Sequence, residues 1–406
     1  MRVLALNPGS SSLRFKLLRS EAARSDDPPE ALASGSVAAI GPHARAKAGV
    51  GSSQREIAAV RAGDAREAVD WALGWLAEQR WLETVDAVGV RVVHAGRQES
   101  AAALVTPGLE AEIERLEALD PLHNAASLTA IRAARRSLLR AVPLAAVFDT
   151  AFHAEMPEVA WRYALPWDLQ EKHGIRRFGF HGLAIASVLE QHASTPHALE
   201  HEADERVVVL HLGSGASVTA VRGGRCIDTS MGFSPLEGLV MSTRSGDLDP
   251  SLVAHLARAE KVGADEVVRR LHERSGLLGI SGRTGDMREI ERLRASGDRR
   301  AALAFDVFVH RAKKHLAAMI ATLGGVDAVL FSGGIGENSA AVRAAICGDM
   351  EWCGIAVDAR ANEEPERSTG RISPADARVL VRVFAADEER LIAKETCALL
   401  AHSGTR

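Results

Sequence analysis

The sequence predicts an α/β protein built from two similar halves, in which mixed sheets are flanked by helices. Residues 3–18 (VLALNPGSSSLRFKLL) and 207–221 (VVVLHLGSGASVTAV) both show an apolar strand pattern, a Gly/Ser turn and a second strand pattern. Each copy is followed, after a helical stretch, by a strand that opens with VDAV, at 85–88 and at 326–329. Strand and helix patterns alternate along most of the chain, which favours mixed sheets covered by helices. The repeat indicates two half-molecules facing a shared cleft.

The length and the polar segments predict the domain organisation. With 406 residues, 47% of them hydrophobic, the chain exceeds what one core supports, so two domains are expected. Residues 193–205 form a polar bridge before the second copy begins. We therefore expect a first domain over 1–150, which also packs against a C-terminal helix at 386–401, a connecting region over 151–205, and a second domain over 206–385.

Charge and composition exclude several classes of partner. A net charge of −4 disfavours nucleic acid and anionic membrane surfaces. The chain opens on a strand-like VLAL without a leader pattern and has no apolar run near ~18 residues, so we expect a cytoplasmic protein with no membrane partner. The cysteines lack metal-ligand spacing and are expected to be reduced structural thiols: Cys226, Cys347, Cys353 and Cys397.

Periodicity predicts the further elements. The apolar spacing is helical in 64–82, 109–120, 124–139, 250–274 and 301–323. Gly223-Gly224 reads as a tight hairpin turn. Residues 19–33 and 41–55 are polar and look like solvated insertions. The second half also carries a Gly/Ser-rich loop over 275–290, which is either functional or a surface insertion.

The glycine clusters indicate phosphate binding. A Gly/Ser turn between strands exposes backbone N–H groups with no bulky side chain in the way. The sequence contains neither GxxxxGK[ST] nor a complete GxGxxG after a strand, which excludes a P-loop and a dinucleotide fingerprint. NPGSSSLRF, HLGSGAS and SGGIGENS instead resemble the phosphate and adenosine loops of the sugar kinase, actin and heat-shock ATPase superfamily.

Longer motifs narrow the resemblance to the acetate kinase (acetokinase) family. The motifs span the chain from Asn7 to the DEE at 387–389, and they are RVVHAG, PLHN, VFDTAFH, RRFGFHG, DTSMGFSPLEGLVMSTRSGDLDP and FSGGIGENS. The resemblance implies two duplicated actin-like (ribonuclease H-like) ATPase domains with the active site in the cleft between them. It also implies a homodimer that transfers the γ-phosphoryl group of ATP reversibly to acetate with Mg²⁺, or Mn²⁺, as cofactor. Kinases of propionate and other short carboxylates, a non-catalytic ATP-binding relative and an ATP-driven switch of the heat-shock type are the alternatives.

Transfer of a phosphoryl group to a carboxylate brings two anions together, so cations are needed. By resemblance, Arg91 holds the substrate carboxylate and Arg244 neutralises the phosphoryl group, although either could pair with a core carboxylate instead. His181 is expected after a strand, where it would donate a hydrogen bond in the transition state. The alternative is a structural histidine at a strand end whose hydrogen bonds are satisfied within the protein. His123 also resembles an active-site histidine, although PLHN could be a helix-entry turn. Asp149 is expected at the end of a buried strand, where a carboxylate either orients a ligand or accepts hydrogen bonds from backbone N–H groups. By resemblance it is the active-site carboxylate, which orients an arginine or the water shell of Mg²⁺.

The resemblance also supplies ligand-binding residues. Asn7 and Glu388 match the Mg²⁺-associated pair, although Glu388 could be a solvated charge opening the last helix. Val93, Leu122, Phe180 and Pro235 would line the acyl pocket around the carboxylate held by Arg91. Asp286 would take the ribose hydroxyls and Arg288 would lie against the base. The other expected nucleotide contacts are Ser10, Ser12, Arg14, His211, Leu212, Gly213, Ser214, Gly215, Met287, Gly334, Ile335, Gly336, Glu337 and Asn338.

Three positions depart from the family pattern. Arg14 stands where the family usually has Lys, and Ser214 where it usually has Asn. Leu-Ala-Ile at 183–185 replaces a Thr-Ser-His-like run. None of these changes removes a catalytic charge, so they bear on nucleotide affinity and on the choice of phosphoryl donor.

Overall fold

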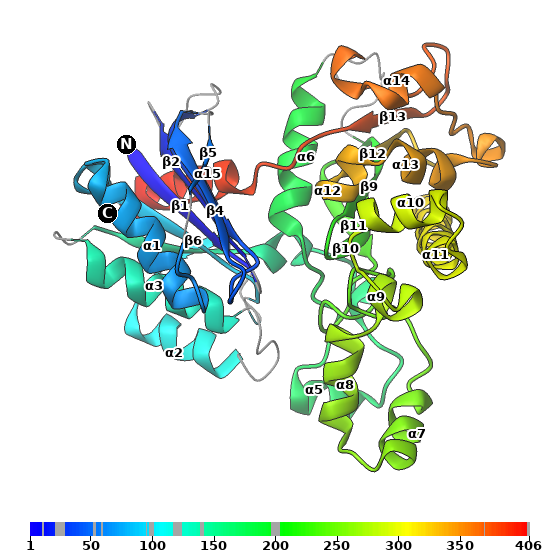
Figure 1. Ribbon diagram of the computed structural model, residues 1–406, viewed down its shortest axis with the longest axis horizontal. Helices are drawn as coiled ribbons and strands as arrows, with labels where there is room; N and C mark the ends of the chain where they lie inside the picture. Colours follow the sequence, from blue (N-terminus) through cyan, green and yellow to red (C-terminus); the bar gives the residue numbers. More distant parts are fainter. Residues whose placement is uncertain are drawn as a thin grey trace. The chain divides into compact units, whose positions relative to one another are not determined.

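The computed structural model describes residues 1–9, 12–20, 29–51, 54–57, 60–94, 96, 101–116, 124–138, 142–195, 204–368 and 370–403. The chain divides into two compact units (Figure 1). Unit 1 contains Met1–Ala154, Gly182–Ser187 and Asp387–Arg406, and unit 2 contains Glu155–His181 and Val188–Ala386.

Unit 1 is built on an eight-stranded mixed sheet in the order β5-β4-β3-β2-β1-β6-β8-β7. Strands β1 to β5 form an antiparallel meander, β6 and β8 run parallel to β1, and β7 is antiparallel to β8. The strands are β1 (Arg2–Pro8), β2 (Ser12–Arg19), β3 (Glu30–Ala38), β4 (Arg45–Val50), β5 (Arg55–Ile57), β6 (Ala87–Val92), β7 (Ala102–Leu104) and β8 (Leu144–Phe148).

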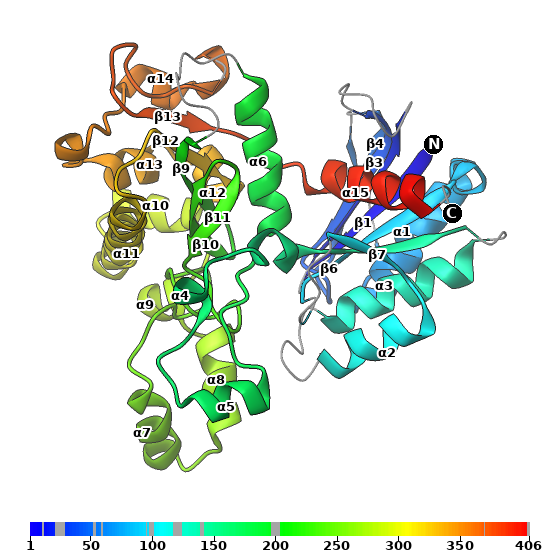
Figure 2. The same ribbon diagram turned by 180° about the vertical axis from the view of Figure 1, so that it is seen from behind.

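Alternation along the strands gives this sheet two buried faces. Leu4, Leu6 and Phe15 belong to a core with α1 (Ala65–Glu78) and α3 (Asn124–Ser137), while Val3 and Ala5 pack with α15 (Glu388–Ser403). Figure 2 shows α15 lying across β1 and β6 on the side opposite α1 and α3. The helix α2 (Pro107–Leu116) packs against α3. The sheet of unit 1 is therefore covered by helices on both sides.

Unit 2 contains a five-stranded sheet in the order β11-β10-β9-β12-β13. Its strands are β9 (Arg206–Leu212), β10 (Ala216–Arg222), β11 (Arg225–Thr229), β12 (Ala328–Ser332) and β13 (Leu380–Val383). The antiparallel β9–β10–β11 and the parallel β12 and β13 reproduce the directions of β1–β2–β3, β6 and β8 in unit 1. This shared topology confirms the predicted duplication and the α/β class, and the β10–β11 pair confirms the turn at Gly223-Gly224.

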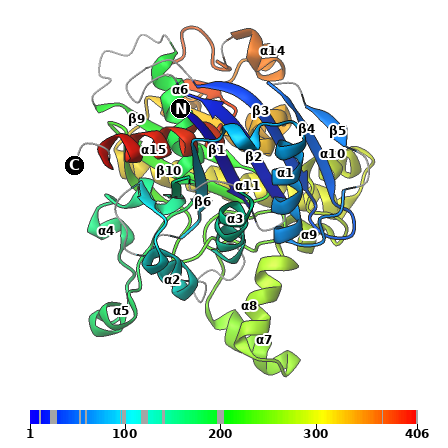
Figure 3. The same ribbon diagram turned by 90° about the vertical axis from the view of Figure 1, so that its left-hand side faces the viewer.

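The helices of unit 2 surround this sheet, and α11 packs across β9, β10 and β11. Figure 3 shows α7 and α8 as a pair of neighbouring helices. The border between the units falls inside α6, whose first residues belong to unit 1. The helices are α4 (Glu158–Trp161), α5 (Trp167–His173), α6 (Gly182–Ser194), α7 (Ser251–Glu260), α8 (Ala264–Glu273), α9 (Gly276–Ser281), α10 (Met287–Ala295), α11 (Arg299–Leu323), α12 (Gly333–Asn338), α13 (Ala340–Cys347) and α14 (Ala359–Glu363).

The predictions for residues 41–55, 250–274 and 275–290 were wrong. Residues 41–55 include the paired strand β4, whose Ala46 and Ala48 are buried while Arg45 and Lys47 are exposed. The expected helix over 250–274 is two helices, because Lys261 takes a left-handed φ of 55° and ends α7. The expected loop over 275–290 contains α9 and the start of α10.

Two other findings concern the cysteines and the polarity of the helices. The cysteines are free and buried, as expected: Cys226, Cys347, Cys353 and Cys397. Within the described ranges, every helix is too short or too polar to cross a membrane.

Candidate active site

Three predicted residues lie at one edge of the unit 1 sheet. Asn7 lies near the end of β1, Arg91 near the end of β6, and Asp149 directly after β8. These strands are parallel neighbours, so their carboxyl ends meet at one edge, the usual place for a ligand site in α/β sheets. The neighbours of Asn7 and Arg91, Leu6 and Val90, belong to the core on the α1 and α3 side. Alternation therefore turns Asn7 and Arg91 toward the α15 side.

Arg91 and Asp149 form a buried ion pair. Arg91 Nη2 donates to Asp149 Oδ2 at 2.8 Å, and the Asp149 side chain is fully buried. Asp149 Oδ1 accepts a hydrogen bond from the backbone N–H of Leu183 at 3.1 Å. Asp149 thus fixes the orientation of the Arg91 guanidinium and ties it to the start of α6. Both sequence interpretations, an oriented site arginine and an arginine paired to a core carboxylate, are compatible with this geometry.

Asn7 joins Arg91 to two glutamates at the start of α15. Asn7 Nδ2 donates to Glu388 Oε2 at 2.7 Å and to Glu389 Oε1 at 2.8 Å. Arg91 Nη1 donates to Asn7 Oδ1 at 3.4 Å, and Arg91 Nε lies 3.9 Å from Glu388 Oε2. The Glu388 side chain is only 13% exposed, so the alternative of a solvated charge was wrong.

Sequence reasoning missed Glu389, which is buried beneath Glu388. Burial raises the pKa of the Glu389 carboxyl, and Glu388 raises this pKa further, whereas Lys16, Asn7 and Arg14 act in the opposite direction. Lys16 Nζ lies 3.8 Å from Glu389 Oε2 and 2.6 Å from Asp387 Oδ1. The signal that could have found Lys16 is the alternation on β2, where Arg14 and Lys16 flank the buried Phe15.

This carboxylate cluster has the chemistry of a hard-cation site. Oxygen donors from one or two carboxylates, completed by waters, are what Mg²⁺ takes in kinase sites. Glu388 and Glu389 offer such oxygens, and the amide of Asn7 orients both carboxylates. Among the residues that the structure describes, no group of three or more His, Cys, Asp and Glu side chains could hold a metal ion. A cation bound through Glu388 and Glu389 would therefore have to take most of its ligands from water.

In unit 2, His181 precedes α6 in a constrained conformation. The expected strand before His181 was wrong: residues 175–181 are irregular, and His181 caps α6 with a left-handed φ of 63°. His181 Nδ1 lies 3.0 Å from Ser217 Oγ, and its ring packs on that of His211 at 4.6 Å between centroids. His211 Nδ1 in turn lies 3.0 Å from Ser332 Oγ. Two strand residues thus fix the direction in which His181 presents its other ring nitrogen.

The glycine turn after β9 brings three predicted residues together. The turn is closed by a bond from Gly213 N–H to the Gly215 carbonyl at 2.8 Å, and Ser214 at its tip is exposed. A Cβ placed on Gly215 would lie 2.9 Å from His181 Nε2 and 3.7 Å from Arg244 Nη1. Glycine at position 215 therefore lets the His181 ring and the Arg244 guanidinium both approach the backbone of the turn.

The second glycine segment follows β12 at the same edge of the sheet. Gly333 has a φ of 77°, and a Cβ there would lie 2.6 Å from the Leu212 carbonyl. Gly334 is exposed, and a Cβ on it would meet no atom within 4 Å. The helix was expected to begin at Asn338-Ser339, but residues 333–338 themselves form α12 and Ser339 caps α13. Gly336 is buried, Ile335 and Glu337 are half-buried, and Asn338 Nδ2 donates to the Gly334 carbonyl at 2.9 Å.

The predicted ribose and base contacts open α10. Asp286 caps this helix, accepts from Arg288 N–H at 3.0 Å and pairs with Arg288 Nη2 at 2.6 Å. This hydrogen-bonded pairing lowers the pKa of Asp286, and Arg288 is 87% exposed. Met287 between them is buried, so any contact from it to a ligand would come from the backbone.

The remaining predicted residues have separate positions. Ser10, Leu122 and His123 lie outside the described residues. Ser12 and Arg14 lie on β2 of unit 1, and Val93 is buried just beyond β6. Phe180 is buried in unit 2, and the Pro235 carbonyl accepts from Arg244 Nη1 at 3.1 Å. An acyl pocket that combines Val93 with Phe180 and Pro235 stays a prediction.

Comparisons with known proteins cover nearly the whole chain. Residues 2–394 match the family model described as the Acetokinase family. The acetate kinase of Streptomyces coelicolor is 45% identical over 416 residues, covering 99% of this chain and 98% of the relative. The crystal structure of Porphyromonas gingivalis acetate kinase is 37% identical with a TM-score of 0.82, covering 98% of this chain and 99% of that one. A propionate kinase from Francisella tularensis is 36% identical with a TM-score of 0.86, covering 97% and 98% respectively.

Proposed function

The chain belongs to the acetokinase family, and on this premise we propose that it catalyses the reversible transfer of the γ-phosphoryl group of ATP to acetate, giving acetyl phosphate and ADP. The observation that carries the proposal is the convergence of the His181 ring, the Arg244 guanidinium and the backbone of a glycine turn at Gly215. These are donors suited to a phosphoryl group in transit.

The residues of unit 2 would act on the phosphoryl group. In the transfer, a carboxylate oxygen of acetate forms a bond to the γ-phosphorus, and the bond from that phosphorus to the oxygen bridging to ADP breaks. Negative charge spreads over three equatorial oxygens. Arg244 would neutralise this charge, His181 would donate a hydrogen bond, and the N–H groups of the turn would hold the phosphate chain.

The residues of unit 1 would act on acetate and on the cation. Acetate is ionised at neutral pH, so the reaction needs no general base, and Asp149 serves to orient Arg91 toward the substrate carboxylate. Glu388, with Glu389 and Asn7 behind it, would hold Mg²⁺ or Mn²⁺ through water. The cation, when bound, supplies charge neutralisation at the phosphates.

Trapping of the product tests this proposal directly. With Mg-ATP, a high concentration of acetate and hydroxylamine, the wild-type protein is expected to form acetohydroxamate, and Arg244→Ala is expected to form at least about 10²-fold less. An absence of hydroxamate from the wild-type protein, with ATP bound, would favour a non-catalytic ATP-binding relative.

The acyl acceptor is the second question, because one similar structure is a propionate kinase. A branched Val93 is expected to keep the pocket short, and one methylene is worth roughly 1–3 kcal/mol in such a pocket. We therefore expect kcat/KM to be highest for acetate and lower, but measurable, for propionate. A maximum at propionate or butyrate would reassign the acceptor.

Three further properties complete the proposal. We expect a homodimer through the second domain, a cytoplasmic location, and ATP and ADP as the nucleotide pair. Sedimentation at several protein concentrations tests the first, and a nucleotide series in the trapping assay tests the last.

A further inference from the structure

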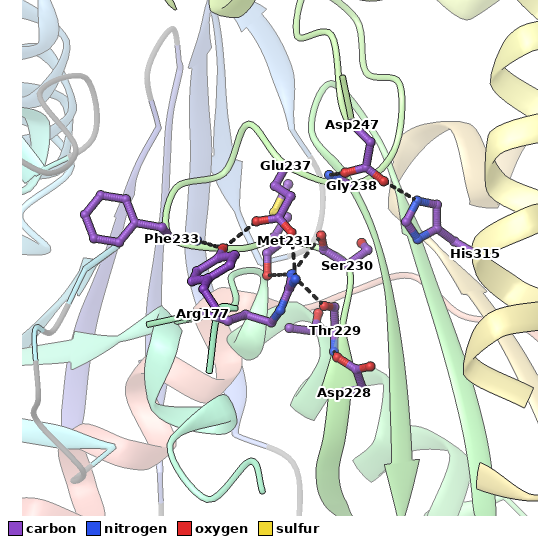
Figure 4. Close-up of polar contacts among 11 residues, drawn as sticks. Arg177, Asp228, Thr229, Ser230, Met231, Phe233, Glu237, Gly238, Asp247 and His315 are labelled. Atoms are coloured by element: carbon purple, nitrogen blue, oxygen red, sulfur yellow. Dashed lines mark hydrogen bonds and ion pairs between the residues drawn. The ribbon is translucent and has the colours of Figure 1, made fainter. Parts of the chain in front are cut away.

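A single arginine fastens the strand end that precedes the Arg244 loop. Arg177 Nη1 donates to the backbone carbonyls of Thr229, Ser230 and Met231 at 3.1, 3.3 and 3.0 Å, and Nη2 donates to Glu237 Oε1 at 2.6 Å (Figure 4). These bonds join the end of β11 to a residue further along the same loop. Charge-assisted bonds of this kind hold geometry better than neutral ones.

Tyr163, the one tyrosine of the chain, completes this arrangement. Its hydroxyl donates to Glu237 Oε2 and accepts from the backbone N–H of Phe233 at 2.7 Å. A Cβ on Gly232 would collide with the Glu237 carboxylate and the Tyr163 hydroxyl, so glycine is required beneath the cluster. We call Tyr163, Arg177 and Glu237 the Arg177 clamp.

The loop held by the clamp contacts Arg244 through its backbone. Pro235 lies between the clamp-bound Phe233 and Glu237, and its carbonyl accepts from Arg244 Nη1 at 3.1 Å. The far end of the loop is fastened separately. Asp247 accepts from Gly238 N–H at 2.7 Å, and its other oxygen lies 3.1 Å from His315 Nε2 on α11 (Figure 4). The loop that carries the Arg244 guanidinium is thus fixed on both sides.

We propose that the Arg177 clamp is a positioning device for phosphoryl transfer, which sets the Arg244 guanidinium and the Pro235 wall before substrates bind. This inference rests on the proposed function. None of the clamp residues needs to touch a substrate, and each acts through the Pro235 carbonyl. A displacement of about 1 Å in a positioned group can cost about 10²-fold in rate. The competing interpretation is that the clamp stabilises unit 2 and has no effect on the reaction.

Steady-state kinetics of Tyr163→Phe and Glu237→Gln separate these interpretations. We expect kcat to fall roughly 10- to 100-fold and the acetate KM to rise, while the ATP KM stays within about twofold. Asp327→Asn is the matched control, because it weakens another arginine–carboxylate pair of the same unit, Asp327 with Arg206 at 2.6 Å. Unchanged kinetic constants in both clamp variants, with thermal melting showing a folded protein, would overturn the inference.

A double-variant cycle tests whether the clamp acts through Arg244. In an Arg244→Ala background, adding Tyr163→Phe is expected to cost little further rate, because the group to be positioned is already gone. If the rate losses of the two single variants multiply in the double variant, the clamp does not act through Arg244 and the inference fails.

The rate of chemical modification of Arg244 is a second readout, which does not depend on activity. Phenylglyoxal modifies arginine side chains, and peptide mass mapping gives the rate of modification at Arg244 separately from the other arginines. We expect faster modification of Arg244 in Tyr163→Phe than in the wild-type protein, with the rate at Arg206 unchanged. An equal rate at Arg244 overturns the clamp inference. If the wild-type protein is inactive but phenylglyoxal still modifies Arg244 faster in Tyr163→Phe, only the proposed function is overturned.

Discussion

Asn7 Nδ2 lies 2.7 Å from Glu388 Oε2, although 381 positions separate the two residues in the sequence. The same amide donates to Glu389 at 2.8 Å, and its oxygen accepts from Arg91 at 3.4 Å. One small side chain therefore connects the end of β1, the end of β6 and the start of α15.

Replacing Asn7 by Ala is expected to weaken the response to Mg²⁺. The two glutamates would lose the donor that orients them, and loss of such a partner typically costs about 10- to 100-fold in metal affinity. The concentration of Mg²⁺ that gives half-maximal rate measures the effect. Gln191→Ala, which removes the hydrogen bond that Gln191 Nε2 donates to the Ala385 carbonyl, serves as the control and should leave the Mg²⁺ dependence unchanged.

Replacing Glu389 by Gln is expected to change how stability depends on pH. Because the pKa of buried Glu389 is raised above 4.5, the folded protein binds more protons than the unfolded one between 4.5 and the raised value. The free energy of unfolding therefore falls as pH rises through this window. The Tm of Glu389→Gln should fall less steeply above pH 4.5 than the wild-type Tm, whereas a variant of exposed Glu78 should follow the wild-type slope.

Replacing Gly215 by Ala is expected to remove most activity with little loss of stability. The new methyl group would lie 2.9 Å from His181 Nε2, so the imidazole would have to move out of its position. We expect kcat to fall about 10²-fold. Gly263→Ala is the matched control, since a Cβ there meets no atom within 4 Å. Equal kcat values for the two variants would show that the close approach of His181 to Gly215 plays no part in the mechanism.

Replacing Gly334 by Val tests the nucleotide side of unit 2. A Cβ at Gly334 meets nothing within 4 Å, so the protein itself does not obstruct it, whereas a ligand that approaches this backbone would collide with the added side chain. The ATP KM should rise at least about tenfold while the acetate KM changes little. An unchanged ATP KM, with ATP binding measured independently by calorimetry, would place adenosine elsewhere.

Replacing Ser214 by Asn is expected to tighten nucleotide binding. Ser214 is exposed at the tip of the glycine turn, and its carbonyl accepts from Ser242 N–H at 3.1 Å, so the backbone should keep its path. An amide adds N–H donors where the serine offers one hydroxyl. A lower ATP KM is expected, and a higher one would show that this chain uses the smaller side chain.

Local sequence patterns predicted the strand ends of the site. The apolar run that stops at Phe148 placed Asp149 after a buried strand, and the structure shows Asp149 directly after β8. The repeated strand-turn-strand pattern predicted the duplicated sheets, because strand alternation and turn glycines are local properties. The resemblance to the acetokinase family is confirmed over residues 2–394.

Contacts between distant segments could not be predicted in this way. Nothing in DEER at 387–390 indicates that Glu389 is covered by β1 and β2, because that depends on which face of the sheet α15 packs against. The strand at 45–50 was mistaken for an insertion because its buried positions, Ala46 and Ala48, carry a residue with low strand propensity. The left-handed backbone of His181 and the close packing of Gly182, where a Cβ would collide with the Asp149 carbonyl oxygen, have no local signal in RRFGFHG.

The position of α15 has a consequence for biosynthesis. Leu391 and Ile392 complete the core that Val3 and Ala5 begin, yet the ribosome makes α15 only after the last strand of unit 2. One face of the first sheet to be translated therefore lacks α15 until almost the whole chain has emerged, when every residue of unit 2 has already been made. Glu388 and Glu389, the proposed cation ligands, lie on the same helix, so they reach their positions only when α15 packs on this sheet.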